Sequence, residues 1–430
     1  MQYSNSSNKG TAIIITLLLP FAGLIYALRN WRQSWAKNAF WLACIYLGSV
    51  MIFQPEGTIL GVGGDAGRHV LRLMDMFRDS SISIGSILSS YQKNAQVIDL
   101  YQPLVTYLVS RFTDNGHVLF AVFALVYGFF YSRNIWYILE KLPNNKLGYL
   151  FILVTLYFLV CPITGINGAR MWTALHVYVY GMMPFLLEKD KSKLLWVLIT
   201  PLIHFSFLYV ALFGLLWYFL PYKMKVNSSL FPTIALSFFI VTLFINSISL
   251  NAINGMLHEY APDVYEERLG EYVDEDYAAG ISSMNEQKNW YVAMSGNTAH
   301  WCYNLLLIAL LPCLRRNFKN NEGLMHLYVF SLFLGGFANL MALMPSGGRF
   351  QLLSQMFKLP LIIMVAMSIP SKDAFRQYVN IGQVFLLLPF IFEIRKLFDF
   401  FSITAILGNF ITVFFWENNV PLIDFIKRII

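Results

Sequence analysis

Three separate stretches of the sequence place a charged side chain directly after a glycine-rich turn, where a helix could begin. They read GVGGDAGR, GINGAR and PSGGR, and the charged residues that follow the glycines are Asp65, Arg170 and Arg349. Backbone N–H groups at a helix start are free to bind an anion, and a guanidinium group can grip a phosphate with two hydrogen bonds. We therefore expect Arg170 and Arg349 to meet in one outward-opening cavity and to bind a phosphate group there.

Two side chains could exchange a proton with a bound ligand. His204 follows Pro201 in the stretch TPLIHFSF, and histidine titrates near neutral pH, as a general base must. The Asp65 carboxylate offers the same chemistry. A structural role stays open for each residue, because Asp65 could simply cap a helix and His204 could be a hydrogen-bonded packing residue. The alternative for Arg170 and Lys358 is that they reach toward lipid head groups.

Two further regions carry polar groups that suit a charged, sugar-containing ligand. Below Arg349, the side chains of Gln351, Gln355 and Lys358 fall on one face of an apolar segment, which would be costly in a membrane unless that face lined a cavity. The acidic segment 251–297 is rich in tyrosine and could stack against sugars, or it could be a solvated lid. The sequence shows no metal-ligand cluster, no P-loop and no Ser-His-Asp spacing.

The elements that position these residues are predicted to be membrane helices. The chain has 430 residues, of which 57% are apolar and only 13% are charged, against about 25% charged in an average soluble domain. Its apolar runs of about 17–22 residues can each cross a bilayer as a helix. We expect an all-α polytopic membrane protein with about thirteen transmembrane helices in a single domain, residues 1–430.

The basic residues predict the topology. The net charge is +7, and lysine and arginine collect in short loops, as they do on the cytoplasmic side of membrane proteins; nucleic acid is not an expected partner. This places two loops outside, 55–116 with interfacial or re-entrant helices and the acidic loop 251–297. The prediction requires 194–220 to be two short helices broken near Pro201, and it makes 401–416 the last span.

Five of these stretches, in order, resemble one known family. The stretches are GGDAGRH, YQPLVTYL, GINGARMWTALHVY, PLIHFSFLY and GGRF, and the resemblance, to the EpsG family of Wzy-type polysaccharide polymerases, spans roughly residues 60–355. Asp65, Arg170, His204 with Ser206, and Arg349 match the family pattern, whereas Gln102 stands where the family has an acid.

The resemblance implies a GT-C-like fold with a cavity facing the periplasm, and a glycosyltransferase in the bacterial inner membrane. It would join oligosaccharide repeat units carried on undecaprenyl diphosphate, with inversion and without a metal or another cofactor. Membrane lipids and a chain-length regulator are the other expected partners. Asp65, Arg170, His204 and Arg349 would be catalytic. The residues expected to bind substrate are Arg68, Tyr101, Gln102, Asn167 and Lys358.

Other functions remain open from the sequence. An O-antigen ligase, or a glycosyltransferase that uses a polyprenyl-phosphate sugar, belongs to the same chemical class. An acyltransferase would need a reactive histidine at membrane depth, for which His204 is the only support. A flippase for lipid-linked oligosaccharides should show inverted repeats and cations near the membrane midplane, and the sequence shows neither feature.

Overall fold

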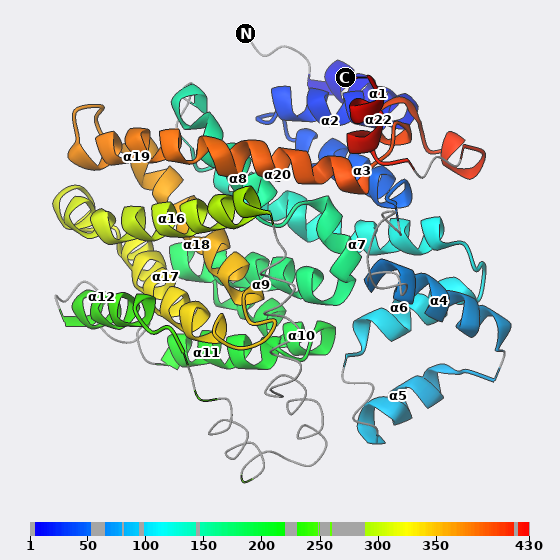
Figure 1. The fold of residues 1–430 in the computed structure, drawn as a ribbon, viewed down its shortest axis with the longest axis horizontal. Coiled ribbons are helices and arrows are strands. Elements are labelled where there is room, and N and C mark those ends of the chain that lie inside the picture. The colour runs from blue at the N-terminus through cyan, green and yellow to red at the C-terminus, as the bar shows by residue number, and fades with distance from the viewer. Residues whose placement is uncertain are drawn as a thin grey trace.

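The structure, a computed structural model, describes residues 5–52, 65–79, 81–93, 99–142, 147–219, 230–247, 249, 259, 289–416 and 420–429. Apart from an isolated bridge between Met51 and Phe401, the regular structure of these residues is entirely helical (Figure 1). The elements are α1 (Asn5–Leu18), α2 (Pro20–Arg29), α3 (Ala36–Ser49), α4 (Asp65–Arg78), α5 (Ile84–Lys93), α6 (Tyr101–Ser110), α7 (Gly116–Leu139), η1 (Leu147–Leu150), α8 (Phe151–Leu159), η2 (Ile163–Gly168), α9 (Ala169–Glu188), η3 (Lys191–Lys193), α10 (Leu194–Ile203), α11 (Phe207–Phe219), α12 (Leu230–Leu243), α16 (Trp290–Asn317), α17 (Glu322–Met341), α18 (Arg349–Ser368), α19 (Ala374–Phe385), α20 (Leu387–Phe400), α21 (Thr404–Leu407), η4 (Thr412–Phe414) and α22 (Leu422–Ile429).

Apolar helices of membrane-crossing length are present. In the part of the chain that the structure describes, four helical segments are long and apolar enough to cross a bilayer: Gly116–Leu139, Gly148–Glu188, Glu322–Met341 and Arg349–Ser368. Shorter apolar helices accompany them, namely Lys9–Leu18, Phe207–Phe219 and Leu230–Leu243. The all-helical fold and the apolar character of its helices are thus as predicted, while the number of crossings stays a prediction.

Several predicted spans are divided in the structure. The first, expected at about residues 12–28, is divided between α1, which ends at Leu18, and α2, which begins at Pro20. Proline accounts for this division, because it has no N–H to donate and disfavours a helical conformation in the residue before it. The stretch 194–220 is also divided, as predicted, but α10 continues through Pro201 and ends at Ile203. His204 is extended there, with φ −150° and ψ 122°.

The prediction of a last membrane span at residues 401–416 is wrong. The chain forms only the short elements α21 and η4 there. The side chain of Asn409 accepts hydrogen bonds from the backbone N–H groups of Ile411 and Thr412, each at 2.9 Å. Such bonds offer the backbone an alternative to helical hydrogen bonding. A hydropathy pattern cannot reveal this competition, because the surrounding residues are as apolar as those of a membrane helix.

The core is a bundle in which helices distant in sequence pack together. α3 packs against α7, α17 lies between α12 and α18, and α9 lies between α7 and α10. On one side of the bundle, α4, α5 and α6 form a separate group (Figure 1), which contacts α7, η2, α9 and α10 of the bundle. This group belongs to the predicted outer loop 55–116. The glycines before Asp65 and most of the acidic loop 251–297 lie outside the described residues.

The contact between α3 and α7 depends on a glycine. A Cβ atom at Gly48 would overlap the Cβ of Ala124 and would lie 2.8 Å from the carbonyl oxygen of Phe120. Because the backbone of α7 cannot yield easily, the two helices can approach this closely only when residue 48 has no side chain.

We predict that Gly48→Ala lowers the free energy of unfolding by about 1–3 kcal/mol through overpacking. Thermal unfolding of the purified protein in detergent measures the change. Gly10→Ala is the matched control, because a Cβ there would meet no atom within 4 Å. Equal melting temperatures for the two variants would contradict the proposed tight contact.

Candidate active site

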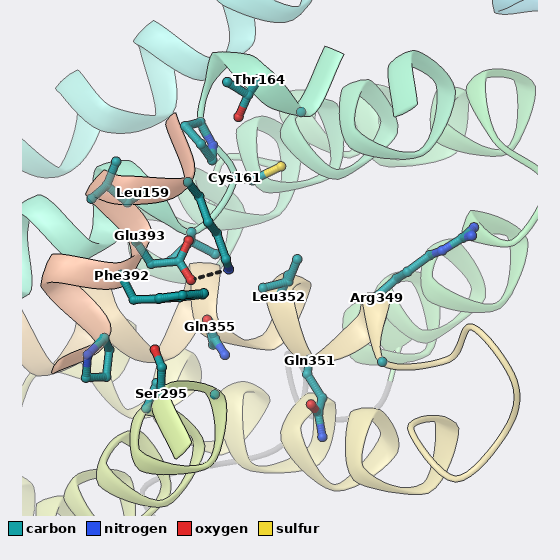
Figure 2. Close-up of a pocket in the computed structure, with 18 of the residues that line it drawn as sticks. Leu159, Cys161, Thr164, Ser295, Arg349, Gln351, Leu352, Gln355, Phe392 and Glu393 are labelled. Atoms are coloured by element: carbon teal, nitrogen blue, oxygen red, sulfur yellow. Dashed lines mark hydrogen bonds and ion pairs between the residues drawn. The ribbon is translucent and has the colours of Figure 1, made fainter. Parts of the chain in front are cut away.

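A polar cavity among the described residues has a volume of about 960 Å³. Its walls come from α8, η2, α9, α16, α18 and α20, so it joins segments that are far apart in the sequence. Figure 2 shows side chains from these elements around it. Its charged or hydrogen-bonding lining residues include Asp65, Thr164, Asn167, Ser295, Asn297, His300, Arg349, Gln351, Gln355, Glu393 and Lys396. This volume is within the range of small-molecule binding sites, about 300–1,000 Å³.

Asp65 is held at the cavity by the turn before α9. Asn167 in η2 accepts a hydrogen bond of 3.0 Å from the backbone N–H of Ala66, which fixes the start of α4 against this turn. A Cβ at Gly168 would lie 3.9 Å from the Asp65 carboxylate, so these elements approach closely. The carboxylate also forms an ion pair with Arg68, one helical turn away. Two predicted residues, Asp65 and Asn167, therefore lie together in the cavity wall, and Arg68 contacts the cavity only through Asp65.

Arg349 occupies the junction between this polar cavity and a smaller one. It begins α18, directly after a turn in which Ser346 has a left-handed backbone with φ 62°. The smaller cavity, about 240 Å³, is lined mainly by apolar side chains and also by His204 and Ser206. Among the described residues, no ion pair or side-chain hydrogen bond involves the Arg349 guanidinium. Arg349 therefore presents a positive charge that no carboxylate of the described residues neutralises.

His204 lies in the smaller cavity beside Ser206. Its Nδ1 atom is 2.8 Å from the hydroxyl of Ser206, and the ring is only 5% exposed. The backbone N–H of Ser206 donates a hydrogen bond of 3.3 Å to Nδ1. Nδ1 is therefore an acceptor, and the hydrogen of the neutral ring lies on Nε2, where it can be donated to a ligand.

Arg170 is held by an acid that the sequence analysis missed. Its Nη1 lies 2.9 Å from one oxygen of Asp99, whose other oxygen accepts a hydrogen bond of 2.7 Å from the backbone N–H of Phe205. Asp99 is 2% exposed. Arg170 lines neither the polar cavity nor the smaller one, although its neighbour Met171 lines both. The prediction that Arg170 and Arg349 meet in one cavity is therefore wrong for these two cavities. A search for an acid near the YQP stretch would have found Asp99, three residues before Gln102.

Two residues predicted to bind substrate, Tyr101 and Gln102, are not among those that line the cavity. The Gln102 amide is buried, accepts a hydrogen bond of 2.6 Å from Arg72 and donates one of 2.9 Å to Thr106. The ring of Tyr101 packs beside that of Phe123, with 6.0 Å between centroids. These contacts give Tyr101 and Gln102 structural roles in the packing of α6, and their contact with substrate stays a prediction.

Lys358 does not reach toward a membrane surface, which was the structural alternative for it. Its ammonium group is buried and donates a hydrogen bond of 2.8 Å to Asn304. The Asn304 amide lies 3.0 Å from the His300 ring, and His300 lines the cavity. Lys358 is thus connected to the cavity indirectly, through two polar side chains of α16.

The cavity contains a second pair of charged residues that the sequence analysis missed. On α20, the ammonium of Lys396 donates a hydrogen bond of 2.6 Å to Glu393. Figure 2 shows Glu393 well separated from Arg349 across the cavity. The signal was present as the charges in FEIRK within an apolar run. In the part of the chain that the structure describes, no group of three or more His, Cys, Asp or Glu side chains could hold a metal ion.

The ring of His69, on α4, lies beside the Arg170–Asp99 pair. It packs edge-on against Phe123, with 5.7 Å between ring centroids, and is 6% exposed. Burial, and then the positive charge of Arg170, lowers the pKa of His69 to about 4 from 6.5, although the Asp65 carboxylate acts in the opposite direction. The folded protein therefore keeps this ring neutral where the unfolded chain would protonate it.

We predict that His69 makes the protein less stable as the pH falls from about 6.5 to about 4, because only the unfolded state binds a proton there. The free energy of unfolding relative to His69→Gln should fall by up to about 3 kcal/mol across this window. Denaturant titrations of both proteins at several pH values measure it. Parallel pH profiles for the two proteins would contradict the prediction.

We also predict a strong coupling between Asp99 and Arg170. A double-mutant cycle with Asp99→Asn and Arg170→Gln should give a coupling free energy of about 1–3 kcal/mol in protein stability. Replacing either residue leaves the other as a polar group with a poor partner. Solvent screens part of this energy, because the Arg170 side chain is 36% exposed. The Arg395–Asp399 pair on α20, at 2.8 Å, is the matched control. A coupling no larger than that of the control would refute the anchoring role of Asp99.

Comparison with known proteins identifies the family of the chain. No curated protein and no solved structure matches the chain. The sequence model of the EpsG family matches residues 89–403. The matched region contains Asp99, Arg170, His204, Arg349 and Lys396 and begins after Asp65. It covers most of the chain, so the protein belongs to the EpsG family, a family of Wzy-type polysaccharide polymerases.

Proposed function

We propose that the protein is a membrane glycosyltransferase that polymerises oligosaccharide repeat units carried on undecaprenyl diphosphate. Family membership supports a role in polysaccharide polymerisation. The observation that carries the proposal further is the Arg349 guanidinium, which stands without a carboxylate partner among the described residues at the junction of a polar and an apolar cavity. A lipid-linked diphosphate has the complementary parts, namely sugars, a strong anion and a hydrocarbon chain.

The reaction requires two chemical functions. A hydroxyl oxygen at the non-reducing end of the acceptor attacks the anomeric carbon of the donor chain, and the bond from that carbon to the diphosphate oxygen breaks. The hydroxyl proton passes to a base, and the lipid diphosphate leaves with its additional negative charge. Direct displacement of this kind inverts the anomeric centre. The protein must therefore supply a cation for the leaving group and a base for the acceptor.

We assign these functions by position. Arg349 holds the leaving diphosphate and stabilises its developing charge, as fixed cations do in other transfer reactions. Asp65 is the proposed base, because its carboxylate lies in the large polar cavity that would receive sugars. His204 lies in the smaller cavity with Arg349, where a ring N–H can donate a hydrogen bond to the departing phosphate. Arg170 acts as a positioning residue through Asp99.

The proposed setting is the outer face of the bacterial inner membrane. The predicted topology supports it, since it places the starts of α4, α9 and α18 outside, together with the break at His204. A regulator of chain length is the expected protein partner there. We propose that the arginine charge serves in place of a metal ion at the leaving group.

We predict that Arg349→Ala abolishes polymerisation in a strain that lacks the native protein, because the leaving diphosphate loses its cation. Electrophoresis of cell-surface glycans should show single repeat units in place of a ladder, a loss of at least about 100-fold in long chains. Arg376→Ala is the matched control. Arg376 also lies in the first turn of a helix, but its guanidinium stacks on Tyr149, 4.0 Å from the ring centroid.

Immunoblotting should show equal amounts of the two variants in the membrane. A normal ladder from Arg349→Ala would exclude the proposed role of this residue. Accumulation of repeat units on the cytoplasmic side would instead indicate a flippase, and long lipid-linked chains that are never attached would indicate a ligase.

A further inference from the structure

A second apolar cavity, of about 480 Å³, adjoins the polar cavity on the side away from Arg349. α2, α3, α8 and α20 provide most of its lining. Leu159, Pro162 and Leu397 line both cavities, so the two lie next to each other and share these residues as a common wall. The lining residues of the apolar cavity include no charged side chain. A molecule with a polar head and a hydrocarbon tail could therefore extend from one cavity into the other.

Helix α20 supplies the polar and the apolar part of this junction. Glu393 and Lys396 line the polar cavity, while Ile394 and Phe398 line the apolar one. The helix packs against α8 along this boundary (Figure 1). An ammonium group has three hydrogens to donate, so Lys396 can keep its hydrogen bond to Glu393 and still bind an anion. The cation of Lys396 thus lies next to Leu397, which lines both the polar and the apolar cavity.

We propose that this apolar cavity holds the isoprenoid chain of the acceptor substrate, whose diphosphate contacts Lys396. The inference rests on the proposed function, because polymerisation of lipid-linked units needs two lipid-linked substrates at once. The site at Arg349, with its own small apolar cavity, serves the donor. The site at Lys396 serves the acceptor, and the sugars of both substrates meet in the polar cavity between them.

Another apolar groove fits this role less well. It lies between α16 and α19, has a volume of about 750 Å³ and shares only Asn297 with the polar cavity. Its lining residues include no charged side chain, and no cation on the same helices lines the polar cavity next to it. An isoprenoid chain there would have no cation beside it to hold its diphosphate.

A variant that fills the acceptor cavity provides the kinetic test. Ala405 lines this cavity and Ala309 lines the groove between α16 and α19, so Ala405→Phe and Ala309→Phe are matched. Polymerisation by the purified proteins is measured with a constant undecaprenyl-linked donor and with acceptors on either undecaprenyl or geranyl diphosphate. Ala405→Phe should raise the KM of the undecaprenyl acceptor about tenfold, and leave kcat and the KM of the geranyl acceptor unchanged.

The outcomes are distinguishable. The proposed acceptor site would be wrong if Ala405→Phe raised the KM of both acceptors equally, or if Ala309→Phe raised the KM of the undecaprenyl acceptor as much as Ala405→Phe does. Neither result would contradict the proposed function. If the wild-type protein makes no polymer from either acceptor, the proposed function fails, and the binding site is then tested by labelling alone.

Photolabelling of the wild-type protein gives that second measurement, which does not depend on a variant that folds. The probe is undecaprenyl diphosphate with a diazirine on its terminal isoprene. Mass spectrometry should find the label in peptides that contain Cys44 or Thr155, which line the cavity. A phospholipid with a diazirine in its acyl chain is the control. Equal labelling by this phospholipid, or label confined to other helices, would overturn the proposal.

Discussion

The arrangement of the site depends on one buried carboxylate. Asp99 binds the Arg170 guanidinium with one oxygen and the Phe205 backbone N–H with the other, and so it joins α6, α9 and the break between α10 and α11. Removing a carboxylate from water is costly, and only well-placed partners offset that cost. Phe205 directly follows His204, so the same carboxylate that orients the arginine also fixes the position of the histidine. Movement of any one of the three segments would disturb the other two.

The cavities around this anchor differ in character, and the charged residues mark where they meet. Arg349 stands where the polar cavity adjoins the small apolar one, and Lys396 stands close to where it adjoins the larger one. A polar space with an apolar space on either side suits molecules that combine sugars, phosphate and hydrocarbon.

Local sequence signals predicted much of this structure. A glycine-rich turn followed by a charged residue correctly marked the helix starts near Asp65, Arg170 and Arg349, because a helix start has recognisable chemistry. Asp99 and the Glu393–Lys396 pair were missed, since their importance comes from neighbours far away in sequence or from the three-dimensional course of the cavity. The failed span at 401–416 has a different cause, namely local hydrogen bonds from Asn409, which no hydropathy average detects.

In the proposed mechanism, the lack of a carboxylate partner for Arg349 among the described residues would also affect turnover. A guanidinium in a partly enclosed site is less well solvated than in bulk water, and a bound anion relieves that deficit. The attraction that would assist departure of the leaving group from the sugar would therefore also retain it in the protein. The catalytic cycle would then advance by the replacement of one anion with another, and the supply of fresh lipid-linked donor would set the pace at which spent carrier leaves.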